Sequence, residues 1–116
     1  MSILEQVFLV LDGVLPNRVS YGTNTVDADE HHVYPYIVYQ VISERGQSYA
    51  DNKSVVRVIT YQITLVTQTK EPLIEDELES ALLQAGFNYQ MITEYFNGDN
   101  SVNRVYEIKQ EDINHE

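Results

Sequence analysis

The sequence holds 116 residues with no cysteine, and its 7 Lys and Arg against 18 Asp and Glu give a formal net charge of −11. This length suits one domain, over residues 1–116, and the missing cysteines exclude disulfides, thiolate metal sites and cysteine nucleophiles. The acidity disfavours binding to nucleic acid, since such binding requires Lys and Arg against the phosphates. No apolar run approaches the about 18 residues of a membrane span. Residues 1–15 carry acids where a signal peptide carries positive charge, so we expect synthesis in the cytosol.

The first expected element is a helix over residues 2–13. Its apolar residues recur at the spacing of one helical face, Ser2 can cap the N-terminus, and Glu5 completes a capping-box pattern. Gly13 and Pro16 end the segment. Residues 17–32 are rich in turn-forming types and predict an exposed loop, with room for a short strand over residues 18–21.

Two strands are predicted over residues 34–44 and 55–69, because both are rich in β-branched and aromatic residues. In the second strand, every other residue is apolar except at two positions, which predicts that this set faces the core. The set consists of Val55, Arg57, Ile59, Tyr61, Ile63, Leu65 and Thr67. Residues 45–54 are polar and predict a hairpin loop longer than the usual roughly two to five residues, of a kind that is commonly functional or mobile.

Pro72 begins a second predicted helix, and Gly86 is suited to the position just after its end. Acids cluster at its N-terminus, where the macrodipole favours them. Its buried stripe is expected to comprise Leu73 or Ile74, then Leu78, Ala81, Leu82 and Ala85.

Residues 87–96 and 102–110 predict a hairpin around residues 97–101, and residues 111–116 are expected to fray. The resulting fold class is α+β: an antiparallel sheet of about four to five strands with two helices packed on one face.

Little in the sequence points to chemistry. Residues 27–32 hold the metal-ligand types Asp27, Asp29, Glu30, His31 and His32, but nothing fixes adjacent histidines in a loop, so a solvated loop is favoured over a metal site. Glu75 and Glu79, one helical turn apart, resemble an acid–base pair, yet a solvated acidic surface that includes Asp76 is favoured. Neither a nucleophile elbow nor a Gly-rich phosphate loop occurs. We therefore expect no enzyme activity, no cofactor and no bound metal.

An interface is a better expectation than an active site. The chain has nine tyrosines and no tryptophan, and most of the tyrosines fall on predicted strands, where ordinary half-buried packing is favoured. Tyr49 lies instead in the polar hairpin loop, with no sheet to pack on, and tyrosine is enriched at the energetic centres of interfaces. The predicted oligomer or partner interface consists of Arg45, Gln47, Ser48, Tyr49, Asp51, Asn52 and Lys53.

The order of these elements carries a resemblance. Pro35-Tyr36-Ile37-Val38-Tyr39 precedes a polar hairpin loop, the apolar strand of residues 58–67, the acidic helix of residues 75–83 and a closing hairpin that ends at residues 104–108. Over residues 36–112 this layout resembles the tail terminator and tail completion proteins of long-tailed bacteriophages, although residues 17–32 have no counterpart. The resemblance implies a ring, usually hexameric, at the head-tail joint of the virion, assembled in the host cytoplasm. The implied partners are further copies of the chain, the tail tube protein and the head connector, with DNA passing through but not bound specifically and no membrane involved.

Three other interpretations stay open. One is another phage neck or head-completion protein of similar build, and another is a regulatory domain unconnected with phages. The third is an acidic DNA-mimic inhibitor, which requires carboxylates at phosphate-like spacing on one surface. The acids of this chain are instead dispersed over helices, loops and the C-terminal tail. A gene position just before a tail tube gene would separate the phage interpretations from the others.

Overall fold

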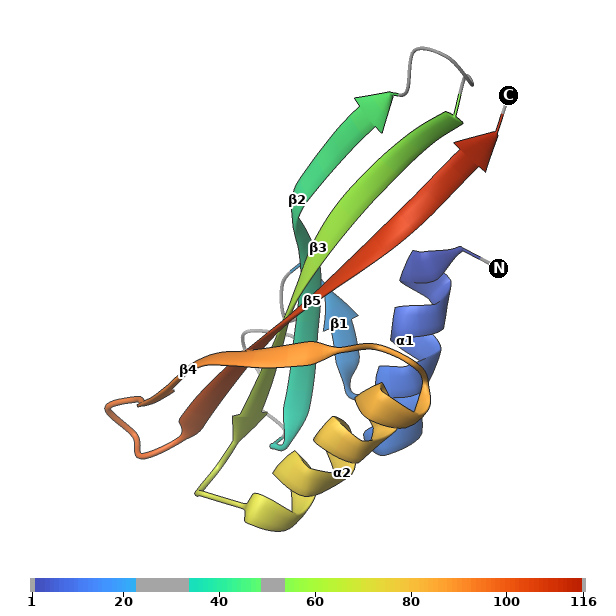
Figure 1. The fold of residues 1–116 in the computed structure, drawn as a ribbon. Helices are drawn as coiled ribbons and strands as arrows, with labels where there is room; N and C mark the ends of the chain where they lie inside the picture. The colour runs from blue at the N-terminus through green and yellow to red at the C-terminus, as the bar shows by residue number, and fades with distance from the viewer. Residues whose placement is uncertain (1, 23–33, 49–53, 116) are drawn as a thin grey trace.

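The computed structural model describes residues 2–22, 34–48 and 54–115, which form two helices and a five-stranded sheet (Figure 1). The elements are α1 (Ile3–Val14), β1 (Val19–Tyr21), β2 (Tyr36–Ser48), β3 (Ser54–Thr67), α2 (Pro72–Gln84), β4 (Tyr89–Phe96) and β5 (Val102–His115). The strand order across the sheet is β1-β2-β3-β5-β4. The predicted α+β class is confirmed, while the packing of both helices on one face stays a prediction.

The sheet is mixed, not wholly antiparallel as predicted. β1 runs parallel to β2, and the other neighbouring strands pair antiparallel. Parallel neighbours need a connection of a dozen or more residues, and the stretch between Tyr21 and Tyr36 supplies that length. The short strand expected over residues 18–21 is thus present, at the outer edge of the sheet beside β2.

Both helices begin and end as the sequence predicts. The side chain of Ser2 accepts a 3.1 Å hydrogen bond from the Glu5 N–H and caps α1. Pro72 stands in the first turn of α2. Gly86, directly after the C-cap of α2, has φ +87°, a conformation that glycine adopts without steric cost, and its N–H donates to the carbonyl of Leu83.

The central strands are longer than expected. The predicted hairpin of β2 and β3 is confirmed, but the two strands stay paired as far as Ser48 and Val55. The predicted loop bounds of 45–54 are therefore wrong, since residues 49–53 alone connect the strands. β5 pairs with β3 up to His115, so the frayed tail is wrong as well. Polar side chains do not stop a sheet from growing, because its hydrogen bonds join backbones. Figure 1 shows β2, β3 and β5 extending past the helices, in a molecule 55 Å along its longest axis.

One hydrophobic core joins the helices to the sheet. The predicted inward set of β3 is confirmed from Ile59 to Thr67, since Ile59, Tyr61, Ile63, Leu65 and Thr67 are all buried. Arg57 is only half-buried, and the side chain of Val55 lies outside the described residues. In α2, Leu78 and Leu82 are fully buried and Ile74 packs against the core, whereas Leu73 and Ala85 are exposed. The cluster is completed by Val7 and Leu11 of α1, Ile37 and Tyr39 of β2, Phe87, and Tyr106 and Ile108 of β5.

Candidate interaction surfaces and a buried charge network

A network of charged side chains joins α2 to β4 and β5. Arg104 on β5 lies 3.1 Å from Glu94, 3.2 Å from Glu79 and 3.7 Å from Glu75. Lys70, just before α2, lies 2.8 Å from Glu75 and 2.6 Å from Glu94. We call these five residues the Arg104 network. Two cations thus neutralise most of the charge of three carboxylates.

Two tyrosines complete the hydrogen bonding of Glu79. Tyr106 and Tyr89 donate to its two carboxylate oxygens at 2.7 and 3.0 Å, and Arg104 Nε donates to the Tyr106 hydroxyl at 2.6 Å. Burial disfavours the charged form of Glu79, but hydrogen bonds from Tyr106, Tyr89 and Arg104 outweigh it and hold its pKa below the ordinary value. The hydrogen bond from Lys70 is the main cause of the lowered pKa of Glu94.

The predicted acidic surface of Glu75, Asp76 and Glu79 is therefore corrected. Glu75 is only 5% exposed and Glu79 is half-buried, and of the three only Asp76 is exposed. Glu75 Oε2 is buried without a hydrogen-bond partner. With their charges paired inside the fold, these glutamates are suited to holding α2 on the sheet and not to exchanging protons with a substrate.

One part of this network had a signal in the sequence. Glu94 and Arg104 lie directly opposite each other in the β4–β5 ladder, and opposite charges on facing strands attract. The turn over residues 97–101 determines which residues of the two strands face each other, so the predicted hairpin implies this contact. The links to Lys70 and Glu75 depend on how α2 sits on the sheet, which no local pattern specifies.

The predicted interface residues divide into two groups. Arg45, Gln47 and Ser48 belong to the β2 ladder, opposite Val58, Val56 and Val55 of β3. Tyr49, Asp51, Asn52 and Lys53 lie outside the described residues, as do Asp27, Asp29, Glu30, His31 and His32.

Within the part of the chain that the structure describes, no group of three or more His, Asp or Glu side chains is arranged to hold a metal ion. Among those same residues, no helix has the length and apolar character to cross a membrane.

Two β-bulges, which the sequence analysis missed, lie on opposite sides of the central strands. The register of β2 against β3 shifts at Ile42, and that of β4 against β5 shifts at Ile92. In each case the isoleucine is an extra residue in its strand, and such bulges commonly re-aim a side chain near the edge of a sheet. Both isoleucines are nearly half exposed, at 45% and 46%.

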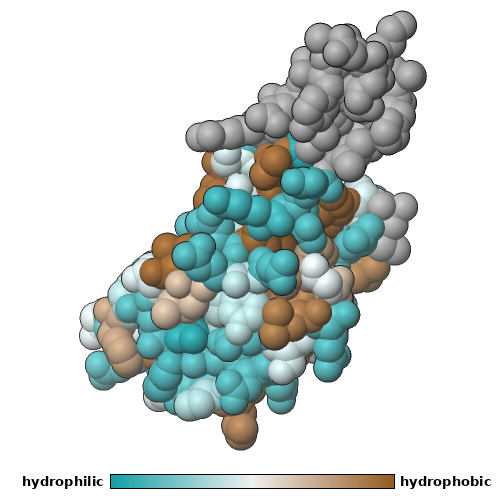
Figure 2. Space-filling model, in the orientation of Figure 1, coloured by the Kyte–Doolittle hydropathy of each residue, from teal (hydrophilic) through white to brown (hydrophobic). Residues whose placement is uncertain are grey.

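Exposed apolar side chains lie on both sides of the sheet. We define the β4 edge as Met91, Ile92, Tyr95 and Phe96, which are all exposed on the outermost strand of one side. The β1–β2 edge on the other side consists of Phe8, Tyr21 and Ile42, which are exposed as well. The rings of Phe8 and Tyr21 lie 6.4 and 5.1 Å from that of Tyr39. Figure 2 shows hydrophobic side chains interrupting a mostly hydrophilic surface, including over β4 at the left.

No model of a known protein family matches this chain, and a search of curated proteins returns no match. Its function is therefore inferred from its own surfaces and from the order of its elements.

Proposed function

We propose that this chain is a structural protein of a tailed bacteriophage: a tail terminator whose copies close into a ring that caps the tail tube and meets the head connector. The observation that carries the proposal is the pair of apolar edges on opposite sides of one sheet. In a cyclic ring, one surface of each copy contacts a different surface of the next copy. The β4 edge and the β1–β2 edge supply two such surfaces.

The composition of these edges favours protein contacts. Exposed apolar side chains that cluster on a soluble protein commonly mark an interaction site, and aromatic residues and Met are enriched in interfaces. The β4 edge contributes Tyr95, Phe96 and Met91. Six of the eight residues of β4 are exposed, whereas a strand with one face on a core buries about every other residue. A neighbouring copy that covers this strand would remove that apolar area from water.

The charge of the chain supports the same proposal. A net charge of −11 on each copy would surround the lumen of a ring with negative potential, and DNA would then pass without being held. The order of helix, strands, acidic helix and closing hairpin agrees with the resemblance to tail terminators in the sequence. The hexameric ring and the tube and connector partners are part of this proposal.

A DNA mimic has less support. Such a protein needs an array of free carboxylates on one surface, whereas on and beside α2 Glu75, Glu79 and Glu94 are paired with Lys70 and Arg104 and only some of the neighbouring acids, such as Asp76 and Glu77, are exposed. A head-completion protein would also use apolar edges to form a ring. The two kinds of protein differ in the partner that each binds. Capping of tail tubes is therefore the function to measure.

The experiment compares the wild-type chain with Ile92→Asp and a control, Leu83→Asp, each mixed with tail tubes assembled from the tube protein of the same genome. Leu83 on α2 is 55% exposed and belongs to neither edge. Negative-stain images are expected to show rings and capped tube ends for the wild type and for Leu83→Asp, and uncapped tubes for Ile92→Asp. Wild-type protein that leaves every tube end open, or an Ile92→Asp protein that caps normally, would reject the proposal.

A further inference from the structure

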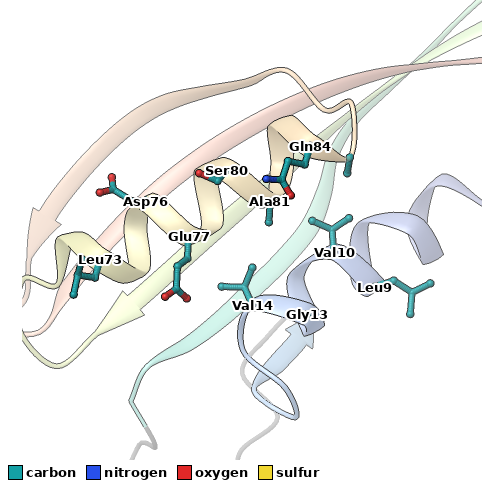
Figure 3. Close-up of a pocket in the computed structure, with 11 residues that line it drawn as sticks. Leu9, Val10, Gly13, Val14, Leu73, Asp76, Glu77, Ser80, Ala81 and Gln84 are labelled. Carbon is teal, nitrogen blue, oxygen red and sulfur yellow. The ribbon is translucent and has the colours of Figure 1, made fainter.

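A groove with a volume of about 750 Å³ runs between α1 and α2 (Figure 3). Val10 and Val14 of α1 and Ala81 of α2 point toward one another across it, with Glu77 beside Val14. These apolar side chains are partly buried, and both valines pack against the core. The groove thus has an apolar floor that neither helix covers.

Two exposed leucines add apolar area at the rim of the groove. Leu9 and Leu73, which line it, are 51% and 78% exposed, and Gly13 on α1 leaves open space above the helix. A Cβ built on Gly13 would meet no atom within 4 Å beyond its chain neighbours and the helix backbone. Covering this groove would remove apolar surface from water, which favours binding by roughly 25 cal/mol per Å².

The charge around the groove is entirely negative. α1 and α2 carry acidic side chains and no Lys or Arg. Asp76 and Glu77, which line the groove, are exposed, and neither forms an ion pair with any other described residue. Lys70 and Arg104, which contact α2, are already engaged by the glutamates of the Arg104 network, and Arg18, just after α1, donates to the backbone carbonyl of Tyr34.

We propose that this groove binds an amphipathic helix of a partner protein, with an apolar stripe on the groove floor and Lys or Arg beside Asp76 and Glu77. An apolar groove between helices is a common receptor for such a segment, and complementary charge adds specificity and speeds association. A helix of a second copy of this chain is a poor occupant, because α1 and α2 carry acidic residues and no Lys or Arg, so like charges would face each other across the groove. This binding goes beyond ring closure, since no groove residue belongs to the β4 edge or the β1–β2 edge.

The test uses two fluorescein-labelled synthetic peptides that share one leucine stripe at helical spacing. One peptide carries Lys and Ala at the other positions, and the second carries Glu and Ala. Fluorescence anisotropy with the full-length chain is expected to show binding of the Lys peptide and none of the Glu peptide. Gly13→Met places a side chain in the open groove and raises helix propensity, so the fold should be retained while affinity falls about tenfold or more.

A matched pair of variants tests the charge. Asp76→Asn/Glu77→Gln removes two charges beside the groove, and Glu107→Gln/Glu111→Gln removes two from β5, so both proteins have the same net charge. The first variant should bind the Lys peptide several-fold more weakly than the second. If the two variants lose the same affinity for the Lys peptide, the attraction is to net charge alone and the proposal is overturned. The proposal is also overturned if Gly13→Met binds the Lys peptide with the same affinity as the wild type.

Two further outcomes are decisive. Self-association of the wild-type chain that Gly13→Met abolishes would show that a second copy fills the groove, and the proposed partner would then be wrong. If Gly13→Met still forms rings and caps tubes but no longer binds the peptide, the result supports the groove as a site separate from the two edges. If Ile92→Asp no longer caps tubes but still binds the peptide, the β4 edge acts in the ring and not in the groove. Each of the two proposals can therefore be rejected without rejecting the other.

Discussion

The hydroxyl of Tyr106 on β5 donates a 2.7 Å hydrogen bond to the carboxylate of Glu79 on α2. Tyr106 is fully buried, and its ring meets that of Tyr89 edge-on at 5.6 Å. A hydrogen bond to a charged group contributes about 1.5–3 kcal/mol, and a carboxylate that loses a buried donor is costly. This contact is therefore a principal link between α2 and the sheet.

Replacing Tyr106 with Phe removes that donor and leaves the ring in place. We expect Tyr106→Phe to lower the free energy of unfolding by about 1–3 kcal/mol, measured by urea denaturation. Tyr89→Phe is the matched control, since Tyr89 donates to the same carboxylate at 3.0 Å but is only half-buried. Its loss should be smaller, and equal losses in the two variants would contradict the role given to Tyr106.

Arg104→Met tests the network as a whole. The change leaves Glu75, Glu79 and Glu94 with Lys70 as their only cation in the network, so carboxylates in or near the interior lose their main partner. Breaking a fully buried ion pair in this way costs about 3–5 kcal/mol. Because the side chains of Arg104, Glu79 and Glu94 are 18%, 21% and 22% exposed, we expect a loss at or below the lower end of that range. Lys109→Met, at an exposed position of the same strand, should stay within about 0.5 kcal/mol of the wild type. Similar unfolding curves for the two variants would show that the network does not stabilise the fold.

Acid should weaken the same network. The pKa values of Glu79 and Glu94 are lower in the folded protein than their ordinary value, so below neutral pH the unfolded chain binds protons first. Their stabilisation is full above the ordinary carboxyl pKa of about 4.3 and disappears as the pH falls through the folded values. Glu94→Gln should therefore be less stable than the wild type near neutral pH, with a deficit that shrinks as the pH falls below about 4.3. Urea titrations at a series of pH values measure this deficit in the free energy of unfolding. A deficit that does not change with pH would contradict the role given to the Glu94 carboxylate.

Local signals predicted the elements well. The cap at Ser2, the proline at the start of α2 and the glycine after its end act within a few residues, so the sequence alone specifies them. The alternation in β3 also predicted its buried face, because period-two burial needs no knowledge of the partner strands.

Features that depend on distant pairing were missed. Residues 45–48 look like a loop from their composition, yet β3 continues beside them and provides backbone partners. The same strand pairs with residues 111–115, which were expected to fray. The sequence analysis assigned Glu75 to a solvated surface, because one of its two cationic partners, Arg104, belongs to a strand far along the chain. The bulges at Ile42 and Ile92 depend on register, which composition does not show.

The proposed ring makes a geometric prediction that suits this chain, because it contains no cysteine. An introduced pair of cysteines can then form disulfides only with each other or with their equivalents in another copy. We place one on each edge, as Ile42→Cys and Ile92→Cys, where the native side chains are nearly half exposed. A disulfide forms only when the two Cα atoms approach within about 7 Å, so cross-linking reports close contact.

If the β4 edge of one copy contacts the β1–β2 edge of the next, the double variant Ile42→Cys/Ile92→Cys should give a ladder of covalent oligomers on oxidation, and the ladder should end at the size of the closed ring. Each single variant should stay monomeric on a non-reducing gel, because a head-to-tail contact never brings two copies of the same position together. Covalent dimers of Ile92→Cys alone would instead indicate a two-fold contact between β4 edges. Such a contact pairs identical edges and is not the contact between different edges on which the proposed cyclic ring depends, so this result would remove the structural basis of the tail terminator proposal.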